Sequence, residues 1–426
     1  MSLSEILTSG ERARLIPAGA DTNKEAKAAS ILLATLQVVP SFQELMLNSL
    51  GRRVGTRAKL QCYTEVTFKK SSKIRPDGLI YLDSGGGRAW TCLVEAKIKN
   101  AKIEKDQIER YMELAKDQQI DAVLTISNEF VASPTHSPIQ VSKTLKRNVG
   151  LFHWSWMFML TQAQLLLNSE KFEDVEQRFI LDEMGRYFSH PSIGISTFNR
   201  MNPEWKELVT KIQSGANIAK SEAEVENSVA AWHQEVRDLC LLMTRKLNRR
   251  VQVHLNRTHN DDPVKRLKDD SEKLVQKKVL TCTLDVPDAA SPIEVTADLL
   301  RRSLTVSMNL AAPKDKQRTT SRVNWLTRQL AKAHPDNIHI KASWPGRAPA
   351  TQEKLEILRE DASRLDTNQK AQSPTSFDVM LVRDAAGKFS GNKTFIEQLE
   401  EVVPYFYEQI GQHLRAYVAP PPRIKR

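Results

Sequence analysis

Two apolar segments separated by a glycine-rich turn most strongly constrain how this chain folds. They comprise residues 77–82 and 90–98, and three consecutive glycines at 85–87 lie between them. Glycine adopts the positive φ angles that tight hairpins need, so we predict two neighbouring strands. The second segment is apolar on both faces, which indicates a central strand of a sheet. Because side chains alternate along a strand, Glu95 and Lys97 are expected on one face.

Asp77 begins the first of these strands, so the hairpin brings two carboxylates and one ammonium group toward one point. Carboxylate oxygens are the ligands that Mg²⁺ prefers, and a lysine beside them can orient or deprotonate an attacking water. The alternative is an exposed pair of Glu95 and Lys97 at a solvated edge. Charges on a central strand are costly without a partner or a metal, which favours the functional interpretation.

Two short motifs here match the signature of a known enzyme family. Pro76-Asp77 and Glu95-Ala96-Lys97 resemble the signature of the PD-(D/E)XK nuclease superfamily. Gln107 and Tyr111 match the Gln-x-x-x-Tyr helix of its RecB-like subgroup, and a spacing of four places them on one helix face. Other acid-x-lysine triplets, at 25–27 and 204–206, lack these neighbours. The resemblance covers roughly residues 20–130 and implies a restriction-endonuclease-like fold.

The order of the predicted elements fits the α-β-β-β-α-β core of that fold. We predict a helix at 22–50, strands near 61–68, 77–82 and 90–98, a helix at 101–118 and a strand at 120–127. Further helices at 151–168 and 173–189 are expected to pack on the sheet. Residues 191–203 are rich in Gly, Ser, Asn and Pro, so we place the end of the first domain at residue 195.

The resemblance also implies roles for individual residues. Asp77, Glu95 and the carbonyl of Ala96 would hold Mg²⁺, for which Mn²⁺ would substitute, and Lys97 would activate water. Gln107 and Tyr111 would act in the same site, although Tyr111 also suits packing against the sheet.

Two further acids are candidates for this site. Glu25 lies on the first predicted helix, but residues 22–25 also form a capping-box pattern in which Glu25 would bond back to the helix start. Glu65 lies on the strand predicted beside Asp77, and its alternative is an outward strand position.

The second half, residues 196–426, is predicted to be a separate α/β domain that recognises a substrate or a partner. A helix is expected at 222–248 and others at 321–333, 352–361 and 393–416. Strands are expected at 279–286, 293–298, 304–310, 337–344 and 377–383. Arg318 and Arg322 belong to a basic cluster just before a helix, a position that suits phosphate contact. An exposed basic loop is the alternative.

Composition points toward a polyanionic partner. The 426 residues carry a formal charge of +11, and basic residues gather before Asp77. Such residues would neutralise the phosphates that flank a scissile bond, or else form a solvated loop. The candidates for nucleic-acid contact here are Lys69, Lys70, Lys73 and Arg75.

Other features narrow the class of protein. The four cysteines are scattered singly, as in a reduced cytoplasmic protein, and the apolar stretches are too short to span a bilayer. Phosphate-loop, GxSxG and HExxH motifs are absent from the sequence.

We therefore expect a metal-dependent hydrolase of phosphodiester bonds in DNA, which resembles components of bacterial restriction and antiphage systems. The alternative is a nucleic-acid-binding or interaction subunit that retains a nuclease fold without cleavage. A protein partner or a homodimer is compatible with either.

Overall fold

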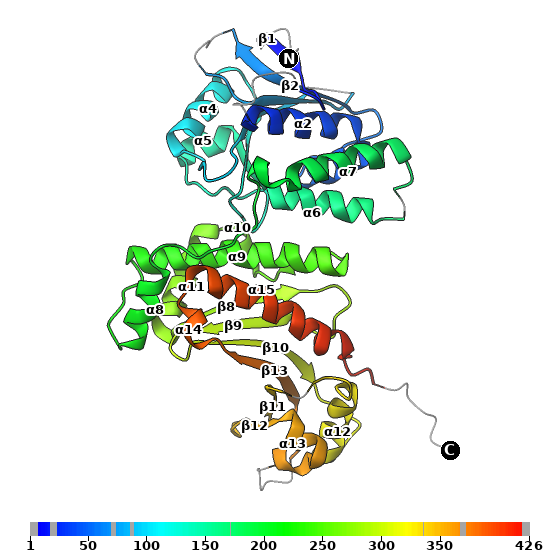
Figure 1. Cartoon of the computed structure of the whole chain (residues 1–426), viewed down its shortest axis with the longest axis vertical. Helices are drawn as coiled ribbons and strands as arrows, with labels where there is room; N and C mark the ends of the chain where they lie inside the picture. The colour runs from blue at the N-terminus through cyan, green and yellow to red at the C-terminus, as the bar shows by residue number, and fades with distance from the viewer. Residues whose placement is uncertain are drawn as a thin grey trace. The chain divides into compact units, whose positions relative to one another are not determined.

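The computed structural model describes residues 7–17, 24–69, 74–85, 89–170, 172–334, 336–366 and 372–419. The chain divides into two compact units, which we call unit 1 and unit 2. Unit 1 comprises residues 1–198 with 233–248, and unit 2 comprises residues 199–232 with 249–426. The main division lies close to the predicted boundary at 195, but the assignment of 233–248 to unit 1 was not predicted. Both units are mixed α/β, and this class was predicted (Figure 1).

Unit 1 is built on a six-stranded sheet with the order β1-β2-β3-β4-β5-β6. Its first four strands pair antiparallel, whereas β4, β5 and β6 run parallel. The bounds are β1 Leu7–Arg12, β2 Lys59–Phe68, β3 Gly78–Asp83, β4 Trp90–Ala96, β5 Ala122–Ser127 and β6 Gly150–Ser155. Every residue of β4 is buried, as expected for a central strand.

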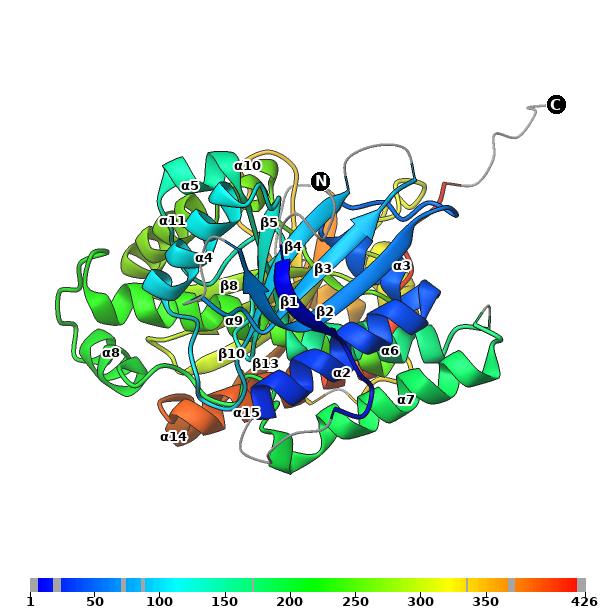
Figure 2. The same cartoon turned by 90° about the horizontal axis from the view of Figure 1, so that it is seen from above.

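Helices cover both faces of this sheet (Figure 2). One face packs against α2 (Lys24–Val38), α3 (Pro40–Ser49), α6 (Trp156–Leu167) and α7 (Val175–Ser189). The other face packs against α4 (Lys105–Asp117) and α5 (Lys143–Asn148). The order α2, β2, β3, β4, α4, β5 is that of the predicted core, with α3 as an addition.

The predicted helix at 22–50 is wrong in one respect, because it is two helices that meet at an angle of 110°. Pro40 is the first residue of α3, and proline inside a continuous helix would remove a hydrogen bond and clash with the preceding turn. Among the described residues no single helix is long and apolar enough to cross a membrane. The bent α2–α3 pair meets that test only when its two helices are counted together.

The predicted helix at 151–168 also begins differently. Its first residues form β6, which continues the parallel ladder from β5, and the helix α6 begins only at Trp156. Ser155 ends the strand and caps the helix, since its Oγ accepts a hydrogen bond of 3.1 Å from the Phe158 N–H. His153 therefore lies on this strand, where it is buried and its Nδ1 lies 2.9 Å from Thr125 Oγ1.

Unit 2 contains a seven-stranded antiparallel sheet with the order β12-β11-β13-β10-β9-β8-β7. Its strands are β7 Gln252–Val253, β8 Val279–Asp285, β9 Ile293–Asp298, β10 Ser303–Ala311, β11 Ile338–Ser343, β12 Thr351–Lys354 and β13 Ser376–Asp384. Burial alternates along β8, β10 and β13, so one face is the core face. The predicted helix at 352–361 begins instead as the strand β12.

The helices of unit 2 are α8 Trp205–Gln213, α10 Arg257–Asp261, α11 Pro263–Lys277, α12 Thr319–Gln329, α13 Leu355–Glu360, α14 Ala386–Phe389 and α15 Asn392–Gln409. Of these, α8, α10, α11 and α14 were not predicted from the sequence. Helix α9 (Ala223–Leu247) contributes its first part to unit 2 and its second part to unit 1. Aromatic rings form part of the core, with Trp205 and Phe395 in contact at 4.6 Å between centroids and their planes tilted by 41°.

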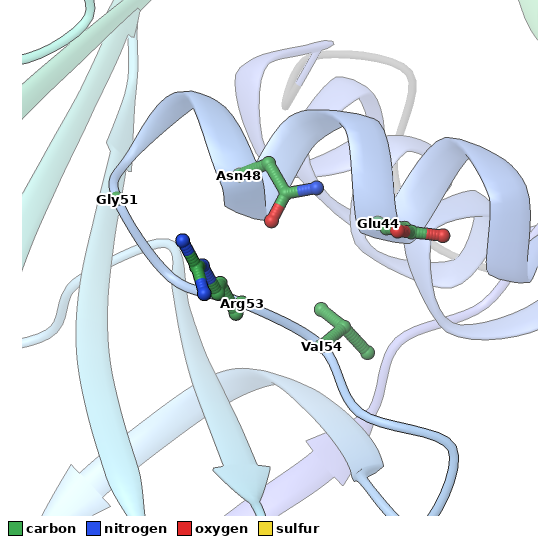
Figure 3. A pocket seen from close by; sticks show the side chains of 5 residues that line it. All are labelled: Glu44, Asn48, Gly51, Arg53 and Val54. Carbon is green, nitrogen blue, oxygen red and sulfur yellow. The ribbon is translucent and has the colours of Figure 1, made fainter.

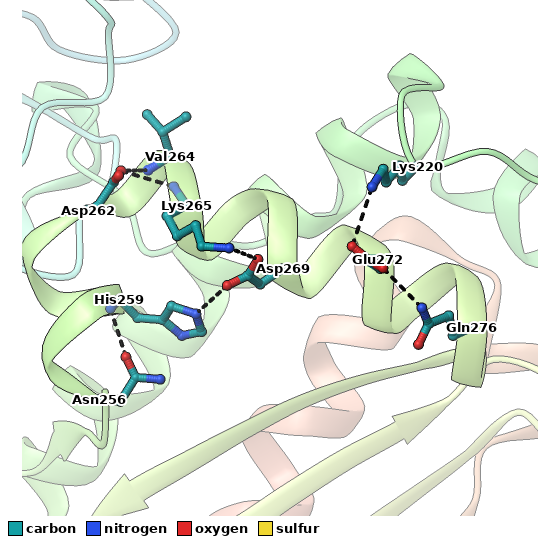
Figure 4. A network of polar contacts seen from close by, with 9 residues as sticks. All are labelled: Lys220, Asn256, His259, Asp262, Val264, Lys265, Asp269, Glu272 and Gln276. Atoms are coloured by element: carbon teal, nitrogen blue, oxygen red, sulfur yellow. Dashed lines mark hydrogen bonds and ion pairs between the residues drawn. The ribbon is translucent and has the colours of Figure 1, made fainter.

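A contact between His259 and Asp269 joins α10 to α11 (Figure 4). Asp262 caps α11, because its Oδ1 accepts hydrogen bonds of 3.0 Å from two N–H groups of the first turn. His259 Nε2 lies 3.0 Å from Asp269, and Lys265 Nζ donates to the same carboxylate at 2.7 Å. The contact between His259 and Asp269 therefore has a structural role, which is to hold the two helices together.

Candidate active site

The register of β3 and β4 brings Asp77 and Glu95 side by side. Gly78 pairs with Val94, so the residues just beyond this pair are 77 and 95. Asp77 Oδ2 accepts a hydrogen bond of 2.8 Å from the Ala96 N–H, which ties the end of one strand to the other. Glu95 is only 2% exposed. The predicted alternation is confirmed, because Cys92, Val94, Ala96 and Ile98 share the core on the opposite face.

Glu95 is the centre of a hydrogen-bonded chain that reaches from β4 to α4. Its Oε1 accepts a bond of 2.5 Å from Lys97 Nζ and another of 2.7 Å from Gln107 Nε2. Gln107 Nε2 also donates to Tyr111 Oη at 3.0 Å. Tyr111 Oη in turn donates to the carbonyl of Arg75 at 3.3 Å. The side chains predicted to form one site are therefore brought together by consecutive elements of unit 1.

The main chain of Lys97 is held on both sides. Its N–H donates to the Ile126 carbonyl at 2.7 Å, which extends the β4–β5 ladder by one residue. Its carbonyl accepts a bond of 2.8 Å from Trp156 Nε1, and the Trp156 side chain is fully buried. Trp156 is thus a positioning residue that the sequence did not reveal, since an apolar helix pattern does not show where an indole N–H points.

The loop after Lys97 is fixed by a second set of contacts. Asn128 Nδ2 donates to the carbonyls of Lys99 at 3.0 Å and of Gly194 at 2.9 Å, and the Lys99 N–H donates to the Gly194 carbonyl at 2.9 Å. Gly194 has φ +80°, and a Cβ at this position would lie 2.3 Å from Lys99 Cγ. Glycine is required here by both conformation and space.

The two additional candidate acids lie in different environments. Glu25, at the start of α2, accepts a bond of 3.3 Å from the Ile98 N–H, and its Oε2 lies 4.0 Å from Lys97 Nζ. It belongs to the site. The proposed capping partners, residues 22 and 23, lie outside the described residues.

Glu65 is not brought into the site, which corrects its inclusion as a candidate acid. It is exposed with φ 52°, and the pairing of β1 with β2 is irregular around it. Tyr63 and Val66 contact the same core, although an odd spacing would place them on opposite faces of a regular strand. One inserted residue therefore forms a bulge, which turns Glu65 outward just where it would face Asp77.

The electrostatics of the site reflect a shortage of positive charge. Burial and the negative charge of Glu95 raise the pKa of Asp77 to about 7, although the Ala96 N–H and Lys97 oppose this. Burial lowers the pKa of Lys97, but the hydrogen bond and charge of Glu95 and the charges of Glu25 and Asp77 raise it overall. The side chain is therefore an ammonium group at neutral pH. Burial, followed by the charge of Glu95, also raises the pKa of Tyr111.

These features fit a divalent cation. The carboxylates of Asp77, Glu95 and Glu25 face a single ammonium group, that of Lys97. The hydrogen bonds to the first two are accepted by Oδ2 of Asp77 and Oε1 of Glu95. Across the described parts of the chain, no three His, Cys, Asp or Glu side chains are grouped so that they could hold a metal ion by themselves. A cation between Asp77 and Glu95 would need main-chain oxygen, such as the Ala96 carbonyl, and water, which Mg²⁺ commonly retains.

The basic residues proposed for nucleic-acid contact have different outcomes. Lys70 and Lys73 lie outside the described residues, and Lys69 follows β2. Arg75 is exposed, and its carbonyl accepts a hydrogen bond from Tyr111 Oη. This bond fixes the main chain from which the Arg75 side chain extends.

In unit 2, Arg318 is exposed immediately before α12, whereas Arg322 has a structural role. The Arg322 guanidinium donates to the carbonyls of Lys316 at 2.7 Å and Pro374 at 2.6 Å. These bonds occupy it in holding two loops together, so the prediction that Arg322 contacts phosphate is not favoured.

A pocket of about 620 Å³ lies elsewhere in unit 1 (Figure 3). It is lined by Glu44, Asn48, Gly51, Arg53 and Val54. The neighbouring Arg52 lies over the ring of Trp90, the first residue of β4, at 5.2 Å. The pocket is therefore near the start of β4, whereas Glu95 lies near its end.

Comparisons with known proteins add no family assignment. No protein-family model matches the chain, and no curated protein shows significant similarity to it. The resemblance to the PD-(D/E)XK superfamily accordingly rests on the motif residues and on the order of the elements that carry them.

Proposed function

We propose that unit 1 hydrolyses phosphodiester bonds in DNA with the help of a divalent cation, Mg²⁺ or Mn²⁺. The observation that carries this proposal is the convergence of Asp77, Glu95 and Lys97 at the end of a buried central strand. A buried surplus of carboxylates is costly unless a cation is bound beside it.

Each residue has a role that its contacts support. Asp77 and Glu95, with the Ala96 carbonyl, would hold the cation, which supplies an activated water and offsets the charge that develops on the phosphate. Gln107 fixes the orientation of the Glu95 carboxylate through the bond of 2.7 Å, and Tyr111 fixes Gln107.

The proposed role of Lys97 follows from its protonation state. Because its pKa is raised, Lys97 is an ammonium group that donates hydrogen bonds rather than a base that accepts a proton. It would therefore orient the attacking water or stabilise a phosphoryl oxygen. We favour this over deprotonation of the water by Lys97.

Cleavage assays with purified protein test this proposal. Circular and linear DNA would be incubated with Mg²⁺, with Mn²⁺ or with EDTA, alongside RNA of the same sequence. We expect metal-dependent cleavage of DNA that Glu95→Gln reduces by about a hundredfold or more. Cutting of circular DNA would identify an endonuclease.

Glu65→Gln is the matched control, because it removes the same charge from a nearby exposed residue that the structure places outside the site. It should leave cleavage unchanged. Binding of DNA without cleavage, unaltered by Glu95→Gln, would instead support a non-catalytic nucleic-acid-binding protein.

A further inference from the structure

An open pocket of about 490 Å³ lies in unit 2 along one side of α12. All but one of its lining residues belong to α12 and recur at spacings of three and four, which places them on one helix face. The lining residues are Lys316, Ser321, Asn324, Trp325, Arg328 and Gln329. None of them belongs to the candidate active site.

The pocket is rich in hydrogen-bond donors. Its polar side chains all carry N–H or O–H groups, and no carboxylate lines it in the described part of unit 2. Lys316 and Arg328 form no ion pair with the described residues. A ligand that complements this lining must be negatively charged and rich in acceptors.

The amide group of Gln329 is held in place beside the pocket. Its Oε1 accepts a bond of 2.6 Å from the Arg415 N–H, which fixes the orientation of the amide. Its Nε2 is buried, so a ligand in the pocket would not reach this donor. The donors available to a ligand therefore belong to the other lining residues.

Trp325 gives the pocket an aromatic surface. The indole is half-buried, and its contact with Tyr417 is edge-to-face, with 6.5 Å between centroids and 85° between the planes. Asp315 interacts with the Tyr417 hydroxyl and does not line the pocket. An aromatic ring beside free cations is the combination that binds single-stranded nucleic acids, by stacking a base and neutralising phosphates.

We propose that this pocket binds a nucleotide unit of a single-stranded nucleic acid. The base stacks on Trp325, and the phosphates that flank this nucleotide contact Lys316 and Arg328. Bases in a duplex are stacked on one another and cannot offer a face to Trp325, so the pocket selects single strands. The binding does not depend on cleavage by unit 1.

Fluorescence anisotropy with a labelled oligothymidylate and the full chain tests the proposal, in EDTA and at low salt. Trp325→Leu should weaken binding about tenfold, as expected for the loss of one stacked base, whereas Trp325→Phe should retain it. Arg328→Ala should weaken binding and lower the slope of log K against log salt by about 0.7. Arg347→Ala, which changes an exposed arginine of unit 2 outside the pocket, should have little effect.

Equal affinity of the wild type, Trp325→Leu and Arg328→Ala would overturn the proposal, and so would tighter binding of a duplex than of the single strand. If circular dichroism shows that Trp325→Leu does not fold, the affinities of Arg328→Ala and Lys316→Ala for the oligothymidylate test the proposal in its place. Competition by dTMP would show that a free nucleotide suffices, and its absence would show that a strand is needed; both support this chemistry. EDTA prevents metal-dependent cleavage, so the binding result does not depend on whether unit 1 cleaves DNA.

Discussion

The side-chain amide of Gln107 donates a hydrogen bond of 2.7 Å to Glu95, and this bond joins the first turn of α4 to the end of β4. Gln107 is therefore part of the site through its effect on Glu95. The bond restricts the rotation of the carboxylate, and a carboxylate that is to bind a metal gains affinity when its orientation is set in advance. The same Nε2 also donates to Tyr111, so the two helix residues act as one support.

Substitution of this support should affect activity more than stability. We expect Tyr111→Phe to lower cleavage several-fold while costing about 1 kcal/mol of folding free energy, the usual net value of one hydrogen bond. Gln107→Ala should have a larger effect on cleavage and on metal affinity. Glu113→Ala, on the exposed side of α4, is the control. A large drop in melting temperature with unchanged specific activity would show that Tyr111 serves packing alone.

Metal binding should release a proton near neutral pH. The pKa of Asp77 is about 7 in the free protein, so below this value a cation must displace the proton of the carboxyl group. Calorimetric titration with Mn²⁺ should show affinity that rises between about pH 6 and 8, with proton release at the lower end. In Asp77→Asn the pH dependence should disappear together with most of the affinity. A pH-independent affinity in the wild type would contradict this assignment.

Without metal, ionisation of Asp77 should destabilise unit 1. The folded pKa of about 7 exceeds the ordinary value of 3.8, so the protonated form is favoured by folding. The stabilisation is complete below about pH 4 and is lost as the pH rises through 7. In EDTA, Asp77→Asn should therefore be more stable than the wild type at pH 8, and the difference should shrink toward pH 4. Urea unfolding at both pH values measures it, and a difference independent of pH would count against the shift.

The core of the candidate site could be predicted because it depends on short-range rules. Strand alternation, the hairpin register and the helical spacing of Gln107 and Tyr111 together place these side chains near Glu95. The bulge at Glu65 could not be predicted, because glutamate has no special preference for the positive φ that it adopts here.

Contacts between segments that lie far apart in the sequence could not be predicted either. The apolar stripe of α9 identifies a buried helix, but it does not show that Leu241 belongs to the core of unit 1 while Trp232 donates to the Thr281 carbonyl in unit 2. The segment 150–155 is aromatic and apolar, and only pairing with β5 distinguishes a strand from the first turn of a helix. Asn128 and Gly194, which hold the loop after Lys97, lie far apart in sequence, and their pairing left no local pattern.

That loop supplies the sharpest test of how the backbone supports the site, because Gly194 and Gly51 of unit 1 have similar φ angles and different surroundings. Gly194 has φ +80° and would place a Cβ against Lys99, whereas Gly51 has φ +71° with nothing within 4 Å. Gly51→Ala should therefore lower the free energy of unfolding only by the cost of a left-handed backbone at alanine, about 1–2 kcal/mol.

Gly194→Ala should destabilise unit 1 further and should also displace Lys99 and, two residues before it, Lys97, so we expect it to lower metal-dependent cleavage. Urea unfolding and cleavage rates of both variants make the comparison. Equal stabilities and equal rates would show that the contact of Gly194 with Lys99 does not support the site.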